Sequence, residues 1–317
     1  MNFESDEVVR RLGARLKMRH LVLLLQIQQH GSLTRVAEHM ASSQPAVTNA
    51  LSELESMFST PLFERSSRGM LPTALGAVVL ERAKAMLNDL DHLAREMEAV
   101  AAGHAAHLHI GVIPFISGQM LSAALKQLQA RMERRLTVTI HEGTSDQLLL
   151  QLKDHIVDIV IGRASSAIDL QHISFEVLFR QQPRLIASRR LAAKLARTKL
   201  DWSRLVTLDW ILGAPHTPMR EQVTDLFLAA GIPPPVPVVE SYSSKLIGEM
   251  IASSDEAVSI VPADIAEELV RIAGVAIVPY SFVWTLPPIA LFTRAAKSPS
   301  PARDLFVEAL RKTCGEA

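Results

Sequence analysis

Residues Gly31–Gly69, GSLTRVAEHMASSQPAVTNALSELESMFSTPLFERSSRG, decide the fold of this chain. They contain two short runs whose apolar residues recur at helical spacing. Ser32 and Ser43 stand where N-caps belong, and Pro45 falls in the first turn of the second run, where a helix tolerates proline. Only residues 41–43 link the runs, so the stretch predicts a helix-turn-helix. The apolar positions are Leu33, Val36, Ala37 and Met40 in the first run and Ala46, Val47, Ala50, Leu51 and Leu54 in the second.

The outward face of the second helix carries short polar side chains of the kind that hydrogen-bond to base edges in the major groove of DNA. Two short strands follow, at Leu62–Phe63 and Met70–Leu71, and enclose a turn that contains arginine. Such a wing places its cations against phosphates or in the minor groove. We therefore expect contacts to DNA bases from Ser43, Gln44, Pro45, Thr48, Asn49 and Ser52, and contacts to the DNA backbone from Arg35, Arg65 and Arg68.

Residues of this stretch and its continuation resemble, in order and spacing, the N-terminal module of LysR-type transcriptional regulators. They are Ala37, Ser43–Ala46, Leu54, Glu55, Pro61–Arg65, Gly69, Thr73 and Gly76. The resemblance implies a winged helix-turn-helix that binds double-stranded operator DNA as a homodimer or, as a dimer of dimers, a homotetramer. Asn49 departs from many relatives, which carry a basic residue there, and Glu53 adds negative charge. Affinity for phosphate would then rest on Arg35, the wing and the helix N-terminus.

The composition is that of a globular protein without a strong overall charge. Among 317 residues, 33 are basic and 33 acidic, so any nucleic-acid contact must come from a local patch. One cysteine, Cys314, excludes an intrachain disulfide and fits a reducing compartment. The acidic start of the chain is unlike a signal peptide, and no run approaches the ~18 apolar residues of a membrane span. We expect a cytoplasmic protein without membrane contact.

Two further helices are predicted around the module. Residues 1–17 form an extension whose arginines, Arg10, Arg11 and Arg15, either contact phosphate or form a solvated face. From Thr73 to Gly103 the apolar residues alternate at steps of four and three, which predicts one long helix with a heptad seam. Such a seam either pairs with a second copy or lies on its own chain's core, and a partner helix covers it most simply. The seam residues are Val79, Ala83, Met86, Leu90, Leu93, Met97 and Val100.

Beyond Gly103 strands and helices alternate, which predicts an α/β domain. The order indicates two Rossmann-like lobes, with crossings near Arg163–Ser166 and Ala263–Gly274. This part resembles the effector-binding domain of the same regulators, built like a periplasmic binding protein. The predicted division is 1–72 for the DNA-binding domain, 73–103 for the linker (dimerisation) helix and 104–317 for the effector-binding domain. Lobe I would comprise about 104–163 and 274–317, and lobe II about 164–273.

Ligands of open α/β folds lie outside the carboxyl ends of strands, facing helix N-termini. The run from Thr144 to Gln147 has capping-box spacing, and we expect Thr217 to cap a helix that has Pro218 at its first position. Helix N-termini beside a guanidinium favour an anionic ligand, so we expect a small organic anion as effector. Arg220 either binds this effector or pairs with a neighbouring carboxylate. The candidate residues are Pro114, Phe115, Ile116, Ser117, Thr144, Ser145, Arg163, His216, Thr217 and Arg220.

Other chemistry has little support in the sequence. His104, His107 and His109 could hold a metal, but no carboxylate or thiol stands near them, and we expect no metal site. No G-x-S-x-G elbow or Gly-rich phosphate loop follows a strand, so we expect neither catalytic residues nor a cofactor. The chief rival is a non-exported small-molecule binding protein whose N-terminal part only dimerises. A salt-dependent gel shift on the DNA upstream of its own gene separates the two.

Three segments narrow the resemblance to one branch of the family. Leu16–Leu21, Pro72–Thr73 and the run from Trp210–Leu212 to Thr217–Arg220 resemble the branch that includes regulators of protocatechuate catabolism and of sugar uptake. Effectors differ within such a branch.

Overall fold

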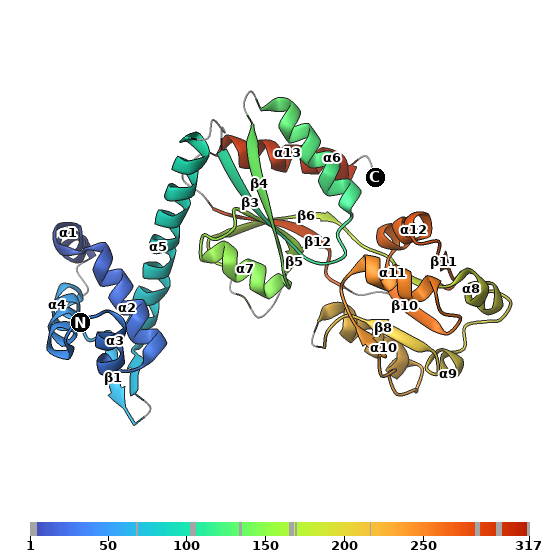
Figure 1. Ribbon diagram of the computed structural model, residues 1–317, viewed down its shortest axis with the longest axis horizontal. Helices are drawn as coiled ribbons and strands as arrows, with labels where there is room; N and C mark the ends of the chain where they lie inside the picture. Colours follow the sequence, from blue (N-terminus) through green and yellow to red (C-terminus); the bar gives the residue numbers. More distant parts are fainter. Residues whose placement is uncertain are drawn as a thin grey trace. The chain divides into compact units, whose positions relative to one another are not determined.

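The computed structural model describes every residue except 1–4, 68, 102–105, 133–134, 165–167, 169, 216, 283–285, 296–299 and 316–317. Within helices it also leaves out the side chains of residues 5, 92, 96, 99 and 100. The chain divides into two units (Figure 1), of which the first comprises Met1–Ala101 with Lys153–Ile156 and the second Ala102–Leu152 with Val157–Ala317.

The first unit contains the helix-turn-helix and its wing. The two wing strands pair antiparallel, with Phe63 opposite Pro72 and Ser66 opposite Gly69. The predicted winged helix-turn-helix is thereby confirmed. The elements of this unit are α1 (Ser5–Arg15), α2 (Met18–His30), α3 (Leu33–His39), α4 (Gln44–Phe58), β1 (Phe63–Ser66), β2 (Gly69–Pro72) and α5 (Ala74–Ala101).

Local hydrogen bonds and a small apolar core explain why these residues adopt this form. The Ser43 hydroxyl accepts a hydrogen bond from the Ala46 N–H at 3.4 Å, which caps α4 as predicted. Ser32 occupies the N-cap position of α3 but makes no capping bond through its side chain. Leu24, Ile27, Val36 and Leu54 are fully buried between α2, α3 and α4, whereas Met40 and Ala46, both predicted apolar positions, are exposed.

The junction between the wing and α5 requires Thr73 and Gly76. The Thr73 hydroxyl accepts from the Gly76 N–H at 3.0 Å and donates to the Pro61 carbonyl at 3.1 Å. A Cβ on Gly76 would lie 1.9 Å from the Leu62 carbonyl oxygen, so no larger residue fits there. The start of α5 is therefore fixed against the wing.

The predicted seam of α5 divides into two parts. Ala83 is only 1% exposed, and Val79 packs against the same core, so this part is covered by its own chain. For the first residues of the seam, the alternative prediction is therefore confirmed: they lie on the core of their own chain. The seam then lies open at Met86, Leu90, Leu93 and Met97, where Leu93 is 52% and Met97 66% exposed. The side chain of Val100 and the predicted helix end at Gly103 lie outside the described residues.

The second unit contains two five-stranded sheets, which confirms the predicted two-lobed α/β architecture. Lobe I has the strand order β4-β3-β5-β12-β6, and Figure 1 shows α6 and α13 side by side on one face of this sheet. Its elements are β3 (Ala106–Val112), α6 (Gly118–Arg131), β4 (Leu136–Glu142), α7 (Ser145–Lys153), β5 (Ile159–Arg163), β6 (Ile173–Phe179), β12 (Ile289–Arg294) and α13 (Pro301–Gly315).

Lobe II has the strand order β11-β7-β10-β8-β9. Its strands and helices bury Trp210 and Phe227 completely. Its elements are β7 (Pro183–Ala187), α8 (Arg189–Leu195), α9 (Trp202–Leu205), β8 (Asp209–Leu212), α10 (Pro218–Ala229), β9 (Val239–Glu240), α11 (Ser244–Ala252), β10 (Ala257–Pro262), α12 (Ala263–Ile272) and β11 (Ala276–Ile277).

The chain crosses between the lobes later than the sequence predicts. β6 pairs antiparallel with β12 in the first sheet, so lobe I continues to Phe179 and the crossing lies at residues 180–182, not near Arg163–Ser166. The return crossing lies between β11 and β12, because β11 pairs with β7 and α12 packs on β7 and β10. Among the described residues, no helix is both long enough and apolar enough to cross a membrane.

Candidate functional site

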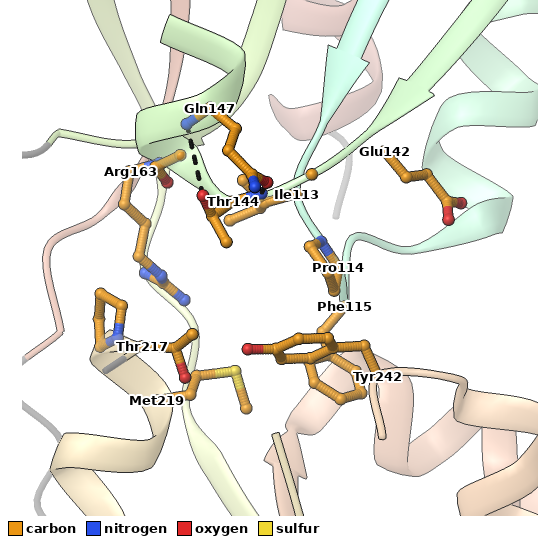
Figure 2. A pocket seen from close by; sticks show the side chains of 13 residues that line it. Ile113, Pro114, Phe115, Glu142, Thr144, Gln147, Arg163, Thr217, Met219 and Tyr242 are labelled. Carbon is orange, nitrogen blue, oxygen red and sulfur yellow. Dashed lines mark hydrogen bonds between the residues drawn. The ribbon is translucent and has the colours of Figure 1, made fainter. Parts of the chain in front are cut away.

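A cavity of about 320 Å³ lies in the second unit, where strand ends of lobe I meet helix starts of lobe II (Figure 2). Its walls are mostly apolar, with a few polar groups between them. It is lined by Ile113, Pro114, Phe115, Glu142, Gly143, Thr144, Ser145, Gln147, Arg163, Thr217, Pro218, Met219 and Tyr242.

The first turn of α7 forms one polar wall of the cavity. The Thr144 hydroxyl accepts from the Gln147 N–H at 3.3 Å, a bond drawn in Figure 2, and the Thr144 N–H donates to Gln147 Oε1 at 3.0 Å. The predicted capping box is confirmed. The Ser145 hydroxyl accepts from the Arg163 N–H at 3.1 Å, which ties this turn to the end of β5.

Arg163 is the buried cation of the cavity. It is 4% exposed, and Figure 2 shows its guanidinium pointing into the space between Thr144 and Thr217. The guanidinium donates to the Pro287 carbonyl and to Gln181 Oε1, both of which are neutral. Burial lowers the pKa of Arg163 to about 10, an effect that the charge of Asp264 partly opposes. Arg163 stays charged at neutral pH, yet within the described residues no carboxylate forms an ion pair with it.

Phe115 and Tyr242 form the aromatic wall. Their rings meet edge to face, with centroids 6.1 Å apart, and a Cβ on Gly213 would lie 2.5 Å from the Tyr242 ring. Phe115 has a φ of +63°, a conformation that costs a residue with a side chain about 1–3 kcal/mol. The Tyr242 hydroxyl is buried, and the described residues give it no hydrogen-bond partner. A ligand with an acceptor at this place would satisfy it.

Some of the candidate effector residues lie elsewhere. Ile116 is buried in the core of lobe I, and Ser117 caps α6 by accepting from the Met120 N–H at 3.4 Å. Arg220 donates to the Gly213 carbonyl and lies 3.7 Å from a Glu240 carboxylate oxygen, so it pairs with a neighbouring carboxylate, as the alternative reading expects. Thr217 does line the cavity, but its hydroxyl donates to the Ala214 carbonyl and does not cap α10. His216 lies outside the described residues.

Seven residues that line the cavity are not among the candidates chosen from the sequence. Gln147 lies in the first turn of α7, close to the predicted Ser145, and Met219 lies in the first turn of α10, close to the predicted Thr217. A prediction that took the whole first turn of each helix would have included both. Tyr242 follows a two-residue strand and has no local signal. The seven residues are Ile113, Glu142, Gly143, Gln147, Pro218, Met219 and Tyr242.

The first unit presents the predicted polar face of α4. Ser43, Gln44, Pro45, Asn49 and Ser52 are exposed. Thr48 is half-buried, and its hydroxyl donates to the Gln44 carbonyl at 2.9 Å and accepts from Gln44 Nε2 at 3.1 Å. Arg35 on α3 and Arg65 on β1 are exposed, and Arg68 lies outside the described residues.

Glutamates and arginines near α4 have structural partners. The Glu55 carboxylate accepts from the N–H groups of Leu62 and Phe63 at 2.8 and 3.2 Å, which joins α4 to the wing. On α1, Arg11 donates to the Ser59 hydroxyl at 2.8 Å, and Arg15 lies 3.8 Å from a Glu53 carboxylate oxygen. These two arginines of the extension thus contact α4 and the residue that ends it.

His107 and His109 on β3 lie beside His141 on β4 in the sheet of lobe I. The rings of His107 and His109 stack with centroids 4.2 Å apart, and His109 Nδ1 lies 3.0 Å from His141 Nε2. In the part of the chain that the structure describes, no group of three potential ligands is arranged to hold a metal ion. His104 lies outside that part.

Comparison with known proteins gives matches to both parts of the chain. Residues 18–77 match the family model described as bacterial regulatory helix-turn-helix protein, lysR family, and residues 101–315 match the LysR substrate binding domain. HTH-type transcriptional regulator GbpR of Azospirillum brasilense is 30% identical over 95% of this chain and 87% of its own length. HTH-type transcriptional regulator PcaQ of Agrobacterium fabrum (strain C58) is 27% identical over 95% of this chain and 96% of its own.

Solved structures share the fold at lower identity. Full-length CbnR complexed with its target DNA is 23% identical, with a TM-score of 0.57 over 94% of this chain and 100% of that one. ArgP from Mycobacterium tuberculosis is 13% identical, with a TM-score of 0.60 over 95% and 98%. The arrangement of a winged helix-turn-helix, a long helix and two α/β lobes is therefore shared with these proteins.

Proposed function

This chain belongs to the LysR family of transcriptional regulators, and on that premise we propose that it binds operator DNA as a symmetric oligomer under the control of a small organic anion. The family is one of regulators and not of enzymes. In this proposal residues 1–72 bind DNA, 73–103 pair two chains and 104–317 bind the effector, all in the cytoplasm. The effector shifts an equilibrium between two arrangements of the lobes and thereby the spacing of the DNA-binding modules.

Contacts to DNA are assigned to α4 and to the two exposed arginines around it. The exposed side chains at the capped start of α4 offer both donors and acceptors to base edges. Arg35 and Arg65 flank this face from α3 and β1, and their charge favours phosphate without reading the sequence.

We expect Arg65→Ala and Gln44→Ala to have different effects on DNA binding. Arg65→Ala should weaken binding to every DNA sequence and lower the slope of log affinity against log salt by about 1. Gln44→Ala should change the order in which DNA sequences are preferred. At the base pair that Gln44 contacts, it should remove about 1–3 kcal/mol of discrimination between the right and the wrong base. Fluorescence anisotropy on the upstream DNA and on single-base variants, at several salt concentrations, measures both effects.

Lys126→Ala provides the matched control, because Lys126 is an exposed cation on α6, outside the DNA-binding module. It should leave affinity and salt dependence unchanged. Equal losses from Arg65→Ala and Gln44→Ala on every DNA sequence would contradict this division of roles.

We infer an anionic effector from one observation: among the described residues no carboxylate forms an ion pair with the buried guanidinium of Arg163, although the charge of Asp264 acts on it. A buried cation is stabilised by an anion far more than by neutral acceptors, because the surroundings screen its charge weakly. The first turn of α7 adds backbone N–H groups that favour negative charge, and Phe115, Met219 and Tyr242 supply apolar contact. A carboxylate on a compact apolar body fits this set of groups.

Thermal unfolding with matched pairs of compounds tests the charge of the effector. Benzoate and hexanoate should raise the melting temperature of the full chain more than benzamide and hexanamide, since only the carboxylates complement Arg163. The proposal is wrong if carboxylates of this size leave the melting temperature unchanged and a neutral compound raises it.

Pairing of two chains is assigned to the open part of the α5 seam. Met86, Leu90, Leu93 and Met97 form an apolar stripe that water covers in the single chain. If this stripe packed against the same stripe of a second copy, both stripes would be removed from water.

A further inference from the structure

Gln181 lies at the crossing from lobe I to lobe II, between β6 and β7. Its side-chain amide holds two walls of the cavity at once. Oε1 accepts from the Arg163 guanidinium, and Nε2 donates to the Phe115 carbonyl at 2.8 Å. No other described residue bonds to both Arg163 and Phe115 through its side chain.

Phe115 is itself a contact between the lobes. It follows β3 of lobe I, but the residue is only 8% exposed and belongs to the apolar cluster of lobe II that contains Ile211 and Ile247. Its positive φ is a conformation that side-chain-bearing residues adopt only where the surroundings hold them. The hydrogen bond from Gln181 is one of the interactions that hold it.

Gln181 also reaches a second cavity, the hinge groove, of about 670 Å³. Residues of both lobes line this groove, among them Asp264 on α12 of lobe II and Cys314 on α13 of lobe I. Gln181 and Asp264 thus line the same groove. A change in the angle between the lobes must therefore change the shape of the hinge groove.

We propose that Gln181 is a positioning residue that couples occupancy of the cavity to the contact between the lobes. An anion in the cavity draws the Arg163 guanidinium toward itself and away from Gln181 Oε1. The amide of Gln181 is then free to turn, the Phe115 carbonyl loses its donor, and the Phe115 ring is released from lobe II. This inference rests on the proposed effector site. A measurement without ligand tests the role of Gln181 independently of that site.

The first experiment needs no ligand and uses Cys314 as a reporter. It is the only cysteine of the chain, so any thiol reaction reports on the hinge groove. Burial raises the pKa of its thiol, and the rate of reaction with neutral 4,4′-dithiodipyridine is therefore measured at alkaline pH. Gln181→Leu, which can neither accept from Arg163 nor donate to Phe115, should raise this rate by about threefold or more.

Gln182→Leu is the matched control. Gln182 is the next residue, lines the same groove, and has no side-chain hydrogen bond among those described. It should react at the wild-type rate. If Gln181→Leu also reacts at that rate, the proposed coupling through Gln181 is wrong.

The second experiment adds benzoate, with benzamide as the neutral control. In the wild type benzoate should change the Cys314 rate, whereas Gln181→Leu should bind benzoate by calorimetry without a change in rate. Gln181→Glu places a carboxylate beside Arg163 and should weaken benzoate binding by about tenfold or more. If benzoate changes the Cys314 reaction rate equally in the wild type and in Gln181→Leu, the proposed coupling through Gln181 is wrong, although the cavity still binds carboxylates. If the wild type binds no carboxylate, the proposed effector fails, and the ligand-free experiment still decides the role of Gln181.

Discussion

Arg163→Met is expected to lower the affinity for a carboxylate effector by about a hundredfold without loss of the fold. Removing one partner of a buried, hydrogen-bonded charge pair costs about 2–5 kcal/mol of binding free energy. Methionine fills a similar volume and brings no charge. Calorimetric titration with benzoate measures the affinity, and thermal unfolding at neutral pH measures the stability of the same variant.

The pKa of Arg163 gives the sign of the effect on stability. Its folded value of about 10 lies below the ordinary pKa of a guanidinium, so the folded state disfavours the charged form at every pH below about 10. Removing the charge relieves this cost across the neutral range, while the Pro287 carbonyl and Gln181 Oε1 lose a donor. We therefore expect a melting temperature within a few degrees of the wild type.

Arg220→Met is the control for Arg163→Met. Arg220 pairs with Glu240 and does not line the cavity. It should retain wild-type affinity for the carboxylate. A comparable loss in both variants, or wild-type affinity in Arg163→Met, would show that Arg163 does not receive the anion.

Leu90→Glu combined with Leu93→Glu is expected to separate the oligomer into single chains and to weaken operator binding by about a hundredfold. Both leucines are exposed in the single chain, so the fold should persist. Facing carboxylates on two copies would repel each other. A single DNA-binding module also binds more weakly than two linked modules, because it lacks the avidity of binding two half-sites together. Sedimentation measures the mass, and a gel shift on the upstream DNA measures the affinity.

Glu81→Gln serves as the control on the same helix, because Glu81 is exposed on α5 and is not part of the seam. It should sediment and bind as the wild type does. If the double variant keeps the wild-type mass, the chains pair through another surface.

Features that depend on near neighbours in sequence could be predicted. The capping box of Thr144 and Gln147 and the N-cap of Ser43 each join residues three apart, so their patterns contain both partners. The place of β6 could not be predicted, because its partner β12 lies more than a hundred residues along the chain and an apolar run does not say which sheet it joins.

The same contrast holds for the cavity and for the long helix. The rule that ligands face strand ends found Thr144, Arg163 and Thr217, because β-strands and helix starts are local features. It could not show that Arg220 turns to Glu240, which is a matter of tertiary packing. The heptad pattern likewise does not distinguish Ala83, covered by its own module, from Leu93, which is open.

The bonds from Glu55 to the wing have a consequence for the DNA itself. They make α4 and the wing one rigid body, so the distance between a major-groove contact and a wing contact is set by the protein. Where a duplex does not match that distance, it has to bend or twist to meet both. The free energy of such deformation depends on base sequence, so base pairs that no side chain touches would still influence how tightly an operator is bound.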